Sequence, residues 1–266
     1  MKRIHLFEFT DLPWYPQTFR RIQTDYLQFV TGLGSGHKNL IPLFAKAMGH
    51  AGTTEIVDLC SGGGGPWLGL LEHFKQSGLS VNIKLTDKYP NPKAIQKWKE
   101  ASRQGIEYLS EPVDATNVPP QLKGMRTLFE GFHHFKPEQA RAILRGALEK
   151  KVAIGIFEAS LKPPFGLLLL LLAPLTTLIG YLLFTPFIKP RAFSRFFWTY
   201  IVPIVPLATC WDGVVSFLRV YSPPDLRELA EPLQDEEYFW EIGQLSTGTP
   251  ILDFTYLLGY PLTKPH

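Results

Sequence analysis

The sequence predicts an α/β protein built on a seven-stranded, mostly parallel sheet whose last strand is antiparallel, with helices on both faces. Three observations support this fold. Short apolar segments alternate with helical segments between residues 55 and 157, which is the pattern of βαβ units. The final two apolar segments, 238–244 and 251–259, are close enough in sequence to form an antiparallel hairpin. A hydrophobic insertion follows the fifth strand and separates it from this pair.

The elements follow in a regular order. Residues 17–48 have a helical apolar spacing that is interrupted by glycines within 32–36. Ser222 is a helix cap, with Pro223 in the first turn of a helix that continues to residue 233. We expect strands at 55–60, 81–86, 107–109, 126–129 and 151–157, and helices at 67–76, 92–104 and 137–150. The chain then divides into an N-terminal helical cap (1–50), an α/β core that holds a cofactor (51–159), the insertion (160–211) and the C-terminal part of the core (212–266).

Composition excludes several classes of protein. The chain has 266 residues, of which 45% are apolar and 13% aromatic, so it can bury a core and is not a disordered chain. Its two cysteines, Cys60 and Cys210, rule out a disulfide-stapled scaffold and a cysteine-built zinc finger, and favour a cytoplasmic location. The formal net charge of +3 is too small to predict a nucleic-acid partner.

A glycine turn after the first strand is the sharpest motif. Gly62 to Gly65 follow Asp58 and Ser61, and a turn without Cβ atoms lets a ligand approach the backbone. A phosphate-binding P-loop is excluded because no lysine follows the glycines. A dinucleotide site needs a glycine where this chain has Trp67 or Leu68. Asp58 would repel a pyrophosphate and attract an ammonium group, and S-adenosylmethionine carries an ammonium and a sulfonium but no phosphate.

Two further acids follow the next strands. Asp87 ends the second strand, where its carboxylate can accept hydrogen bonds from both ribose hydroxyls of an adenosine. Asp114 follows the third strand and can accept from an adenine amino group. Three acids are therefore expected around one site at the carboxyl edge of the sheet.

With these residues, the chain resembles the class I S-adenosylmethionine-dependent methyltransferases over residues 50–158 and 212–262. The family motif, acid-x-Gly-x-Gly-x-Gly, reads Asp58-Leu59-Cys60-Ser61-Gly62-Gly63-Gly64, so Cys60 replaces the first glycine. The resemblance implies that S-adenosylmethionine is the cofactor. It also implies the cofactor-binding residues: Asp58, Cys60, Gly62 and Gly64 around the methionine part, Asp87 at the ribose, and Asp114 and Ala115 at the adenine.

The same resemblance places the methyl acceptor beside the end of the fourth strand, at residues 129–135. His133 or His134 could act as general base because histidine titrates near neutral pH, and Glu130 is a rival base. Alternatively, one histidine only orients the loop. Phe132 could contact the acceptor or simply pack. We expect no metal site, since adjacent histidines lack the i, i+4 spacing and a nearby third ligand.

The insertion contains two uncharged runs, 165–188 and 196–211, each interrupted by prolines. Residues 160–211 hold four basic residues and no acidic ones. Because strands precede and follow the insertion, the chain must return to the side it left, which favours a hairpin lying in the membrane surface over one that spans it. A soluble lid remains the third interpretation. Asp212, Arg219 and Tyr221, just beyond it, could line the acceptor pocket or make local ion pairs and caps.

These predictions combine into methyl transfer from S-adenosylmethionine to a small hydrophobic or lipid-like acceptor. We expect membrane-surface contact through 165–211 on the cytoplasmic side, with a soluble cytoplasmic protein as the alternative. A non-catalytic membrane-associated protein that binds the cofactor is the second candidate. A nucleic-acid methyltransferase is the third, disfavoured by the near-neutral core and by the absence of an Asn/Asp-Pro-Pro-aromatic sequence after the fourth strand.

Overall fold

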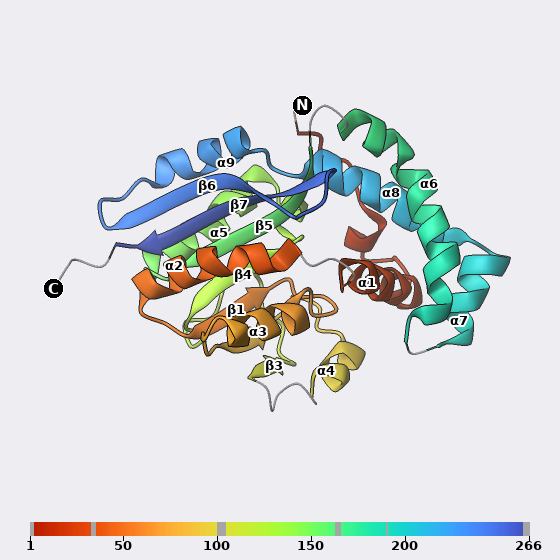
Figure 1. Ribbon diagram of the computed structural model, residues 1–266, viewed down its shortest axis with the longest axis horizontal. Helices are drawn as coiled ribbons and strands as arrows, with labels where there is room; N and C mark the ends of the chain where they lie inside the picture. Colours follow the sequence, from red (N-terminus) through yellow and green to blue (C-terminus); the bar gives the residue numbers. More distant parts are fainter. Residues whose placement is uncertain (1–2, 33–35, 100–104, 163–165, 190, 263–266) are drawn as a thin grey trace.

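The sheet of the computed structural model confirms the predicted fold class. The structure describes residues 3–32, 36–99, 105–162, 166–189 and 191–262. Seven strands lie in the order β3-β2-β1-β4-β5-β7-β6 (Figure 1). They are β1 (Glu55–Leu59), β2 (Asn82–Leu85), β3 (Ile106–Tyr108), β4 (Met125–Phe129), β5 (Ile154–Leu161), β6 (Tyr238–Ser246) and β7 (Leu252–Pro261). The first five strands pair in parallel, and β7 is antiparallel to both β5 and β6, as the sequence predicted.

Helices cover both faces of this sheet and one end of it. They are α1 (Gln17–Gly32), α2 (Ile41–Ala51), α3 (Trp67–Gln76), α4 (Pro92–Trp98), α5 (Pro137–Glu149), α6 (Gly166–Phe184), α7 (Phe193–Phe196), α8 (Ile204–Arg219) and α9 (Pro223–Ala230). One face of the sheet packs against α2, α3 and α4, and the other against α5 and α9.

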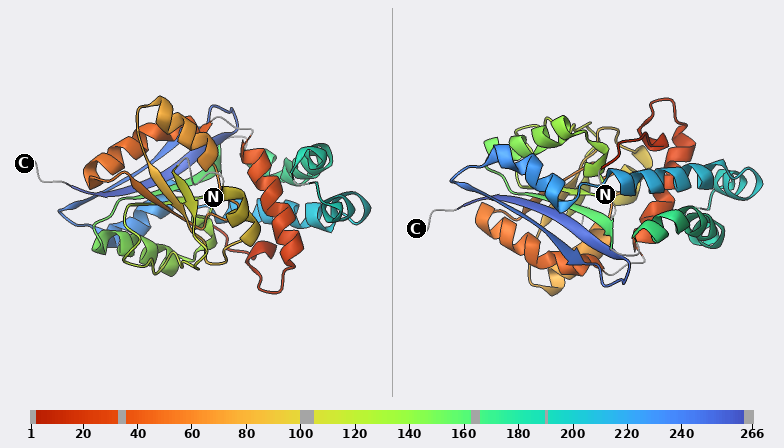
Figure 2. Two further views of the ribbon diagram at one scale, coloured as in Figure 1. Left: turned by 90° about the horizontal axis from the view of Figure 1, so that it is seen from below. Right: turned by 90° about the horizontal axis from the view of Figure 1, so that it is seen from above.

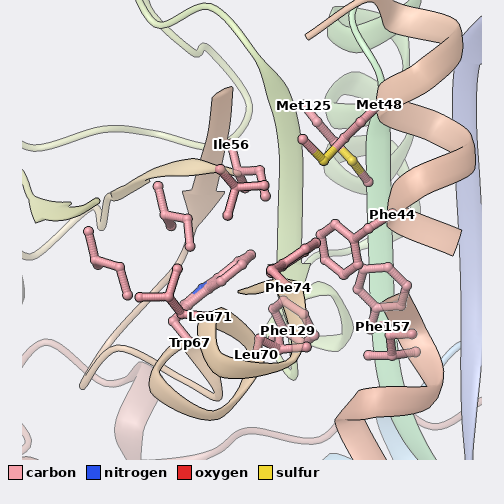
Figure 3. Close-up of a cluster of buried hydrophobic side chains, with 14 of the residues drawn as sticks. Phe44, Met48, Ile56, Trp67, Leu70, Leu71, Phe74, Met125, Phe129 and Phe157 are labelled. Carbon is pink, nitrogen blue, oxygen red and sulfur yellow. The ribbon is translucent and has the colours of Figure 1, made fainter. Parts of the chain in front are cut away.

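Alternating strand side chains build two cores, one on each face. Ile56, Phe129 and Phe157 point to the α2–α3 side, where they pack with Phe44 and the fully buried Trp67 (Figure 3). Their neighbours in sequence, such as Val57, Leu128 and Ile156, point to the α5–α9 side. Burial on both faces explains why the parallel strands read as nearly continuous apolar runs.

A third apolar cluster forms a separate helical layer made of α1, α6, α7 and α8. From here on we call this layer the cap; of the predicted N-terminal helical cap, 1–50, it includes only α1. The rings of Tyr26 on α1 and Tyr181 on α6 stack with centroids 3.8 Å apart, and Ile22 and Val205 pack around them. The cap lies at one end of the molecule, where β5 leads into α6 (Figures 1 and 2). It therefore covers the edge of the sheet at which the parallel strands end.

Several predicted boundaries are corrected by these contacts. The division at residue 50 cuts α2, which packs on the sheet and belongs to the core. The division at residue 211 cuts α8, a continuous helix of the cap. β5 begins three residues later than predicted because Lys151 has a left-handed φ of 48°, and it continues to Leu161 because it pairs with β7. The predicted helix 92–104 and the glycine segment 32–36 lie partly outside the described residues.

Candidate active site at the carboxyl edge of the sheet

The glycine turn begins directly after β1 and is held from beneath by Asp58. Cys60, Gly62 and Gly64 have positive φ values of 58°, 52° and 106°. Asp58 is 2% exposed, and its carboxylate accepts hydrogen bonds from Ser61 Oγ at 2.6 Å and Thr127 Oγ1 at 2.7 Å. Burial raises the pKa of Asp58 to about 6, even though these two hydroxyls lower it. In this structure Asp58 therefore holds the turn, and its contact with an ammonium group stays a prediction.

The two motif glycines face different surroundings. A Cβ atom at Gly62 would meet no atom within 4 Å, so this side of the turn borders open space. A Cβ atom at Gly64 would lie 2.2 Å from the indole of Trp98, which packs on the turn. Trp98 Nε1 and Gln28 Nε2 both donate to Gly63 O, at 3.0 and 2.9 Å. The free space for a ligand is thus at Gly62, whereas Gly64 accommodates the indole.

Asp87 connects the glycine turn to the end of β2. Its carboxylate accepts from Gly62 N–H at 2.9 Å and from Tyr89 N–H at 2.8 Å. A carboxylate has about four lone-pair sites, so two remain for ligand hydroxyls. The sequence-predicted position of Asp87 beside the turn is therefore present in the structure.

Asp114 lies on the next loop and is half-buried. Partial burial raises its pKa, but hydrogen bonds from Lys88 and Thr116 outweigh this and lower it to about 2. Lys88 Nζ is 2.8 Å from the carboxylate in an exposed ion pair. Ala115 is buried among apolar side chains on the α5 side of the sheet. Asp114 is thus ionised and accessible, while Ala115 faces the core.

Glu130 follows β4 and lies next to the glycine turn. It has a left-handed φ of 50°, and a Cβ atom on the following Gly131 would be 3.2 Å from Cys60 Cβ. The side chain is exposed, and one carboxylate oxygen accepts from Ala159 N–H at 2.8 Å. Desolvation by the surrounding protein, together with the like charge of Glu158, raises its pKa. Glu130 therefore lies at the surface, beside the glycine turn and the end of β5.

Glu158 and His133 form a buried pair that the sequence analysis missed. Glu158 ends the apolar run of β5, and its carboxylate lies 2.5 Å from His133 Nδ1. It also accepts from the N–H groups of Phe132 and His133, at 2.6 and 3.2 Å. Burial alone would raise the pKa of Glu158, but His133 and these donors lower it. The sequence did contain a signal for this pair, because Glu158 is an acidic residue directly after the apolar run 151–157.

His134 belongs to a network with the N-terminal segment 3–11. Its Nδ1 is 2.8 Å from Asp11. Burial lowers the pKa of His134, but Asp11 and Glu8 outweigh burial and raise it. Arg219 NH1 lies 2.7 Å from both Glu8 and Asp11. Glu8, His133 and His134 have potential ligand atoms within 4.8 Å of one another, so a third ligand is nearby after all. The Arg219 guanidinium already supplies a positive charge there, and the absence of a metal stays a prediction.

The predicted acceptor-binding residues have structural partners instead. Phe132 is fully buried against Tyr221, whose hydroxyl donates to Phe135 O at 2.8 Å. Asp212 is buried and accepts from Phe9 N–H at 2.7 Å and from Gln23 Nε2 at 3.1 Å. Together with Arg219, these residues hold segment 3–11 and the loop after β4 in place. These contacts favour the alternative in which Phe132 packs and Asp212, Arg219 and Tyr221 make local hydrogen bonds and ion pairs, and their role at an acceptor pocket stays a prediction.

Comparisons with known proteins agree with the fold. No sequence-family description and no curated protein matches the chain. A putative zinc-dependent alcohol dehydrogenase from Rhodobacter sphaeroides is similar over 92% of this chain and 98% of its own, at 11% identity and a TM-score of 0.51. The mitomycin 7-O-methyltransferase MmcR is similar over 94% of this chain and 69% of its own, at 12% identity and a TM-score of 0.48.

Human N-acetylserotonin methyltransferase, in complex with S-adenosylmethionine, is similar over 86% of this chain, at 13% identity and a TM-score of 0.46. The chain spans about half the length of that enzyme, 52%. At these identities the similarity concerns the fold alone. Two of these three solved structures are described as methyltransferases, and the membership of this chain in that family stays a prediction.

Proposed function

We propose that this chain transfers a methyl group from S-adenosylmethionine to a small apolar acceptor, with Glu130 as general base. The observation that carries the proposal is the glycine turn. It is open beside Gly62, and carboxylates at Asp87 and Asp114 flank it. Ionised oxygens suit the hydroxyls and amino groups of a nucleoside and repel phosphates. These hydrogen-bond acceptors fit S-adenosylmethionine better than a dinucleotide.

The binding residues have separate tasks. The open side of Gly62 would receive the methionine part, Asp87 the ribose hydroxyls, and Asp114 the adenine amino group. When bound, S-adenosylmethionine supplies an electrophilic methyl group on a positively charged sulfur. Asp58 keeps the turn in its left-handed conformation from below, through Ser61.

Glu130 is the base in this proposal for three reasons: its side chain is exposed, a hydrogen bond fixes its orientation, and its pKa is raised. Ala159 N–H fixes one carboxylate oxygen and leaves the other free to accept a proton. His133 keeps Glu158 ionised, and the Glu158 charge raises the pKa of Glu130 toward the range in which a carboxylate is an effective base. The bound cofactor would supply the methyl group and retain the electron pair on its sulfur, and Glu130 would accept the proton released by the acceptor oxygen or nitrogen. His133 is buried, and we assign it a positioning role.

The acceptor is expected to be apolar because the insertion, which supplies α6 and part of α8 to the cap, contains two long uncharged runs. Residues 165–188 and 196–211 contain no charged side chain. A desolvated surrounding also protects the reacting atoms from water.

Calorimetric titration tests the cofactor assignment. The chain should bind S-adenosylmethionine and its demethylated product, and neither NAD nor ATP. Asp87→Asn should weaken binding roughly 100-fold, the loss of about two charge-assisted hydrogen bonds. Glu107→Gln, an exposed acid on β3, is the matched control and should bind normally. Tight binding of NAD, or unchanged affinity in Asp87→Asn, would overturn the assignment.

A transfer assay tests the chemistry. Labelled methyl groups should move into the organic phase of a partitioned cell extract. Glu130→Gln should lower turnover roughly 100- to 10,000-fold without changing cofactor affinity. Glu158→Gln should shift the acidic limb of the pH–rate profile to lower pH, because it removes the charge that raises the pKa of Glu130. Cofactor binding without any transfer would favour the non-catalytic candidate, and normal turnover in Glu130→Gln would contradict the base assignment.

A further inference from the structure

One side of α6 is apolar and exposed along its length. Seven large aliphatic residues are between 41% and 71% exposed: Leu168, Leu171, Leu172, Leu175, Ile179, Leu182 and Leu183. Their spacing of three, four or seven residues places them on one face of the helix. At 1.5 Å per residue, this face is about 22 Å long. A soluble monomer seldom exposes such a continuous apolar surface.

The exposed surface continues past the end of α6. Phe187 is 64% exposed, Phe193 on α7 is 84% exposed, and Ile201 is 70% exposed. Figure 1 places α6 and α7 at the outer end of the molecule, away from the sheet, and the views of Figure 2 agree. We call these residues and the seven of α6 the outer face.

The charged residues of segment 160–211, which contributes the outer face, are all basic. Lys189 and Arg191 are exposed between η5 (Thr185–Phe187) and α7. The other two basic residues of segment 160–211 are paired elsewhere, Lys162 with Asp253 at 3.0 Å and Arg195 with Asp25. Since the segment has no acidic residue, its free charge complements an anionic surface.

The opposite side of α6 packs against α1 and α8. Tyr181 is fully buried, and its hydroxyl is 2.8 Å from Thr209 Oγ1 on α8. Gly180 allows close approach to Tyr26, whose hydroxyl would be 2.3 Å from a Cβ atom there. A helix that is packed on one side and bare on the other can lie in a membrane surface.

A membrane-spanning arrangement is disfavoured by the rest of the cap. α6 has the length and composition of a spanning helix, and 193–201 with 204–219 meet the same test only as a pair bent by 78°. However, α8 carries Asp212 and Arg219, which are buried against segment 3–11. β5 and β7 pair in one sheet, so both ends of the insertion lie on the same side. Among the described residues, only the bent pair 193–201 with 204–219 could return a crossing by α6.

A second copy of the chain fits the outer face less well. When two such faces meet, each brings Lys189 and Arg191 and no acidic residue from its own segment to pair with them. A bilayer with anionic headgroups accommodates both the apolar stripe and the positive charges.

We propose that the outer face docks on an anionic membrane, with α6 lying in the plane of the headgroup layer and Lys189 and Arg191 on lipid phosphates. This inference goes beyond the proposed methyl transfer and does not depend on it. Docking would place the cap, and the strand ends that it covers, beside the bilayer.

Vesicle flotation tests the docking without cofactor or turnover, so its failure is distinguishable from failure of the proposed function. The wild-type chain should float with vesicles of equal parts phosphatidylcholine and phosphatidylglycerol. Leu171→Glu with Phe193→Glu should reduce the bound fraction more than tenfold. Lys189→Ala with Arg191→Ala should weaken binding to these vesicles roughly 30-fold, about fivefold per charge.

Phe239→Glu is the matched control, an equally non-conservative change of a 45% exposed aromatic residue on the edge strand β6. It should float like the wild type, and thermal melting should show that every variant is folded. The proposal is overturned if the wild type stays unbound, or if the double glutamate variant floats normally. It is also overturned if light scattering finds a lipid-free dimer that the glutamates dissociate, because a second copy would then cover the face.

Discussion

Asp58→Asn is the substitution that most directly tests how the glycine turn is supported. Asp58 is buried, its ordinary pKa is 3.8, and its pKa in the folded protein is about 6. An acid with a raised folded pKa contributes full stability below its unfolded pKa and loses it as pH rises through the folded pKa. Asparagine has the same shape and no charge, and its side-chain amide can accept a hydrogen bond from one of the hydroxyls of Ser61 and Thr127 and donate to the other.

The size of the effect follows from the two pKa values. The ionisation of Asp58 costs folding about 1 kcal/mol near pH 4.5 and about 3 kcal/mol near pH 8, at 1.36 kcal/mol per pKa unit. The stability advantage of Asp58→Asn over the wild type should therefore grow by about 2 kcal/mol between these two pH values. Stability is best measured by urea unfolding of both proteins across this range.

The same substitution separates stability from binding. If the negative charge beneath the turn attracts the cofactor ammonium, Asp58→Asn should be more stable at pH 8 and yet bind S-adenosylmethionine more weakly. A stability difference that stays constant from pH 4.5 to pH 8 would refute the reasoning, because Asp58 would then not titrate with a raised pKa.

Three further predictions concern the surroundings of the site. Gly62→Ala should lower the melting temperature modestly, through the strain of a Cβ at a φ of 52°, and should weaken cofactor binding because that Cβ enters open space. Gly64→Ala should lower the melting temperature more, because its Cβ also meets Trp98. Calorimetry and thermal melting of this pair would expose an error if Gly62→Ala bound the cofactor normally or melted as low as Gly64→Ala. Cys60→Val should destabilise the fold by about 1–2 kcal/mol in urea unfolding, because a branched side chain is strained at a φ of 58°; equal stability would argue against strain. Arg219→Gln should cost about 3–5 kcal/mol at neutral pH, since it removes the guanidinium that pairs with the buried Glu8 and with Asp11. The loss should shrink as pH falls below about 4 toward 2, because the pKa of Asp11, which burial raises, is lowered to about 2 by hydrogen bonds and charge from His134 and Arg219, and Asp11 loses its charge in that range; a loss independent of pH would contradict this account.

The sequence predicted those parts of the site that depend on local order. Asp58 lies near the end of β1, and Asp87 and Asp114 follow β2 and β3. The carboxyl ends of parallel strands meet at one edge, so the proximity of these acids could be predicted. The apolar periodicity likewise located the strands, although it placed the start of β5 too early, where Lys151 makes a tight turn.

Contacts between distant segments could not be predicted in this way. Glu158 meets His133 across 25 residues, and Arg219 meets Glu8 across 211 residues. Trp98 covers Gly64 from a helix with no motif of its own. In each case a residue that is unremarkable in its own segment acquires a role from the packing of another element. For the same reason, the sequence left open whether Asp212 and Tyr221 line a pocket or make local contacts, because their partners lie in the N-terminal segment and the loop after β4.

The order of elements also matters during biosynthesis. Leu161 at the end of β5 pairs with Leu252, so the sheet is completed only after the whole insertion has been translated. At 5–20 residues per second, roughly 4–15 s separate the synthesis of Phe184 from that of Pro261. During that interval a nascent chain presents a bare leucine-rich helix before its sheet is closed. Early capture by a lipid surface or a chaperone would then protect this intermediate from aggregation.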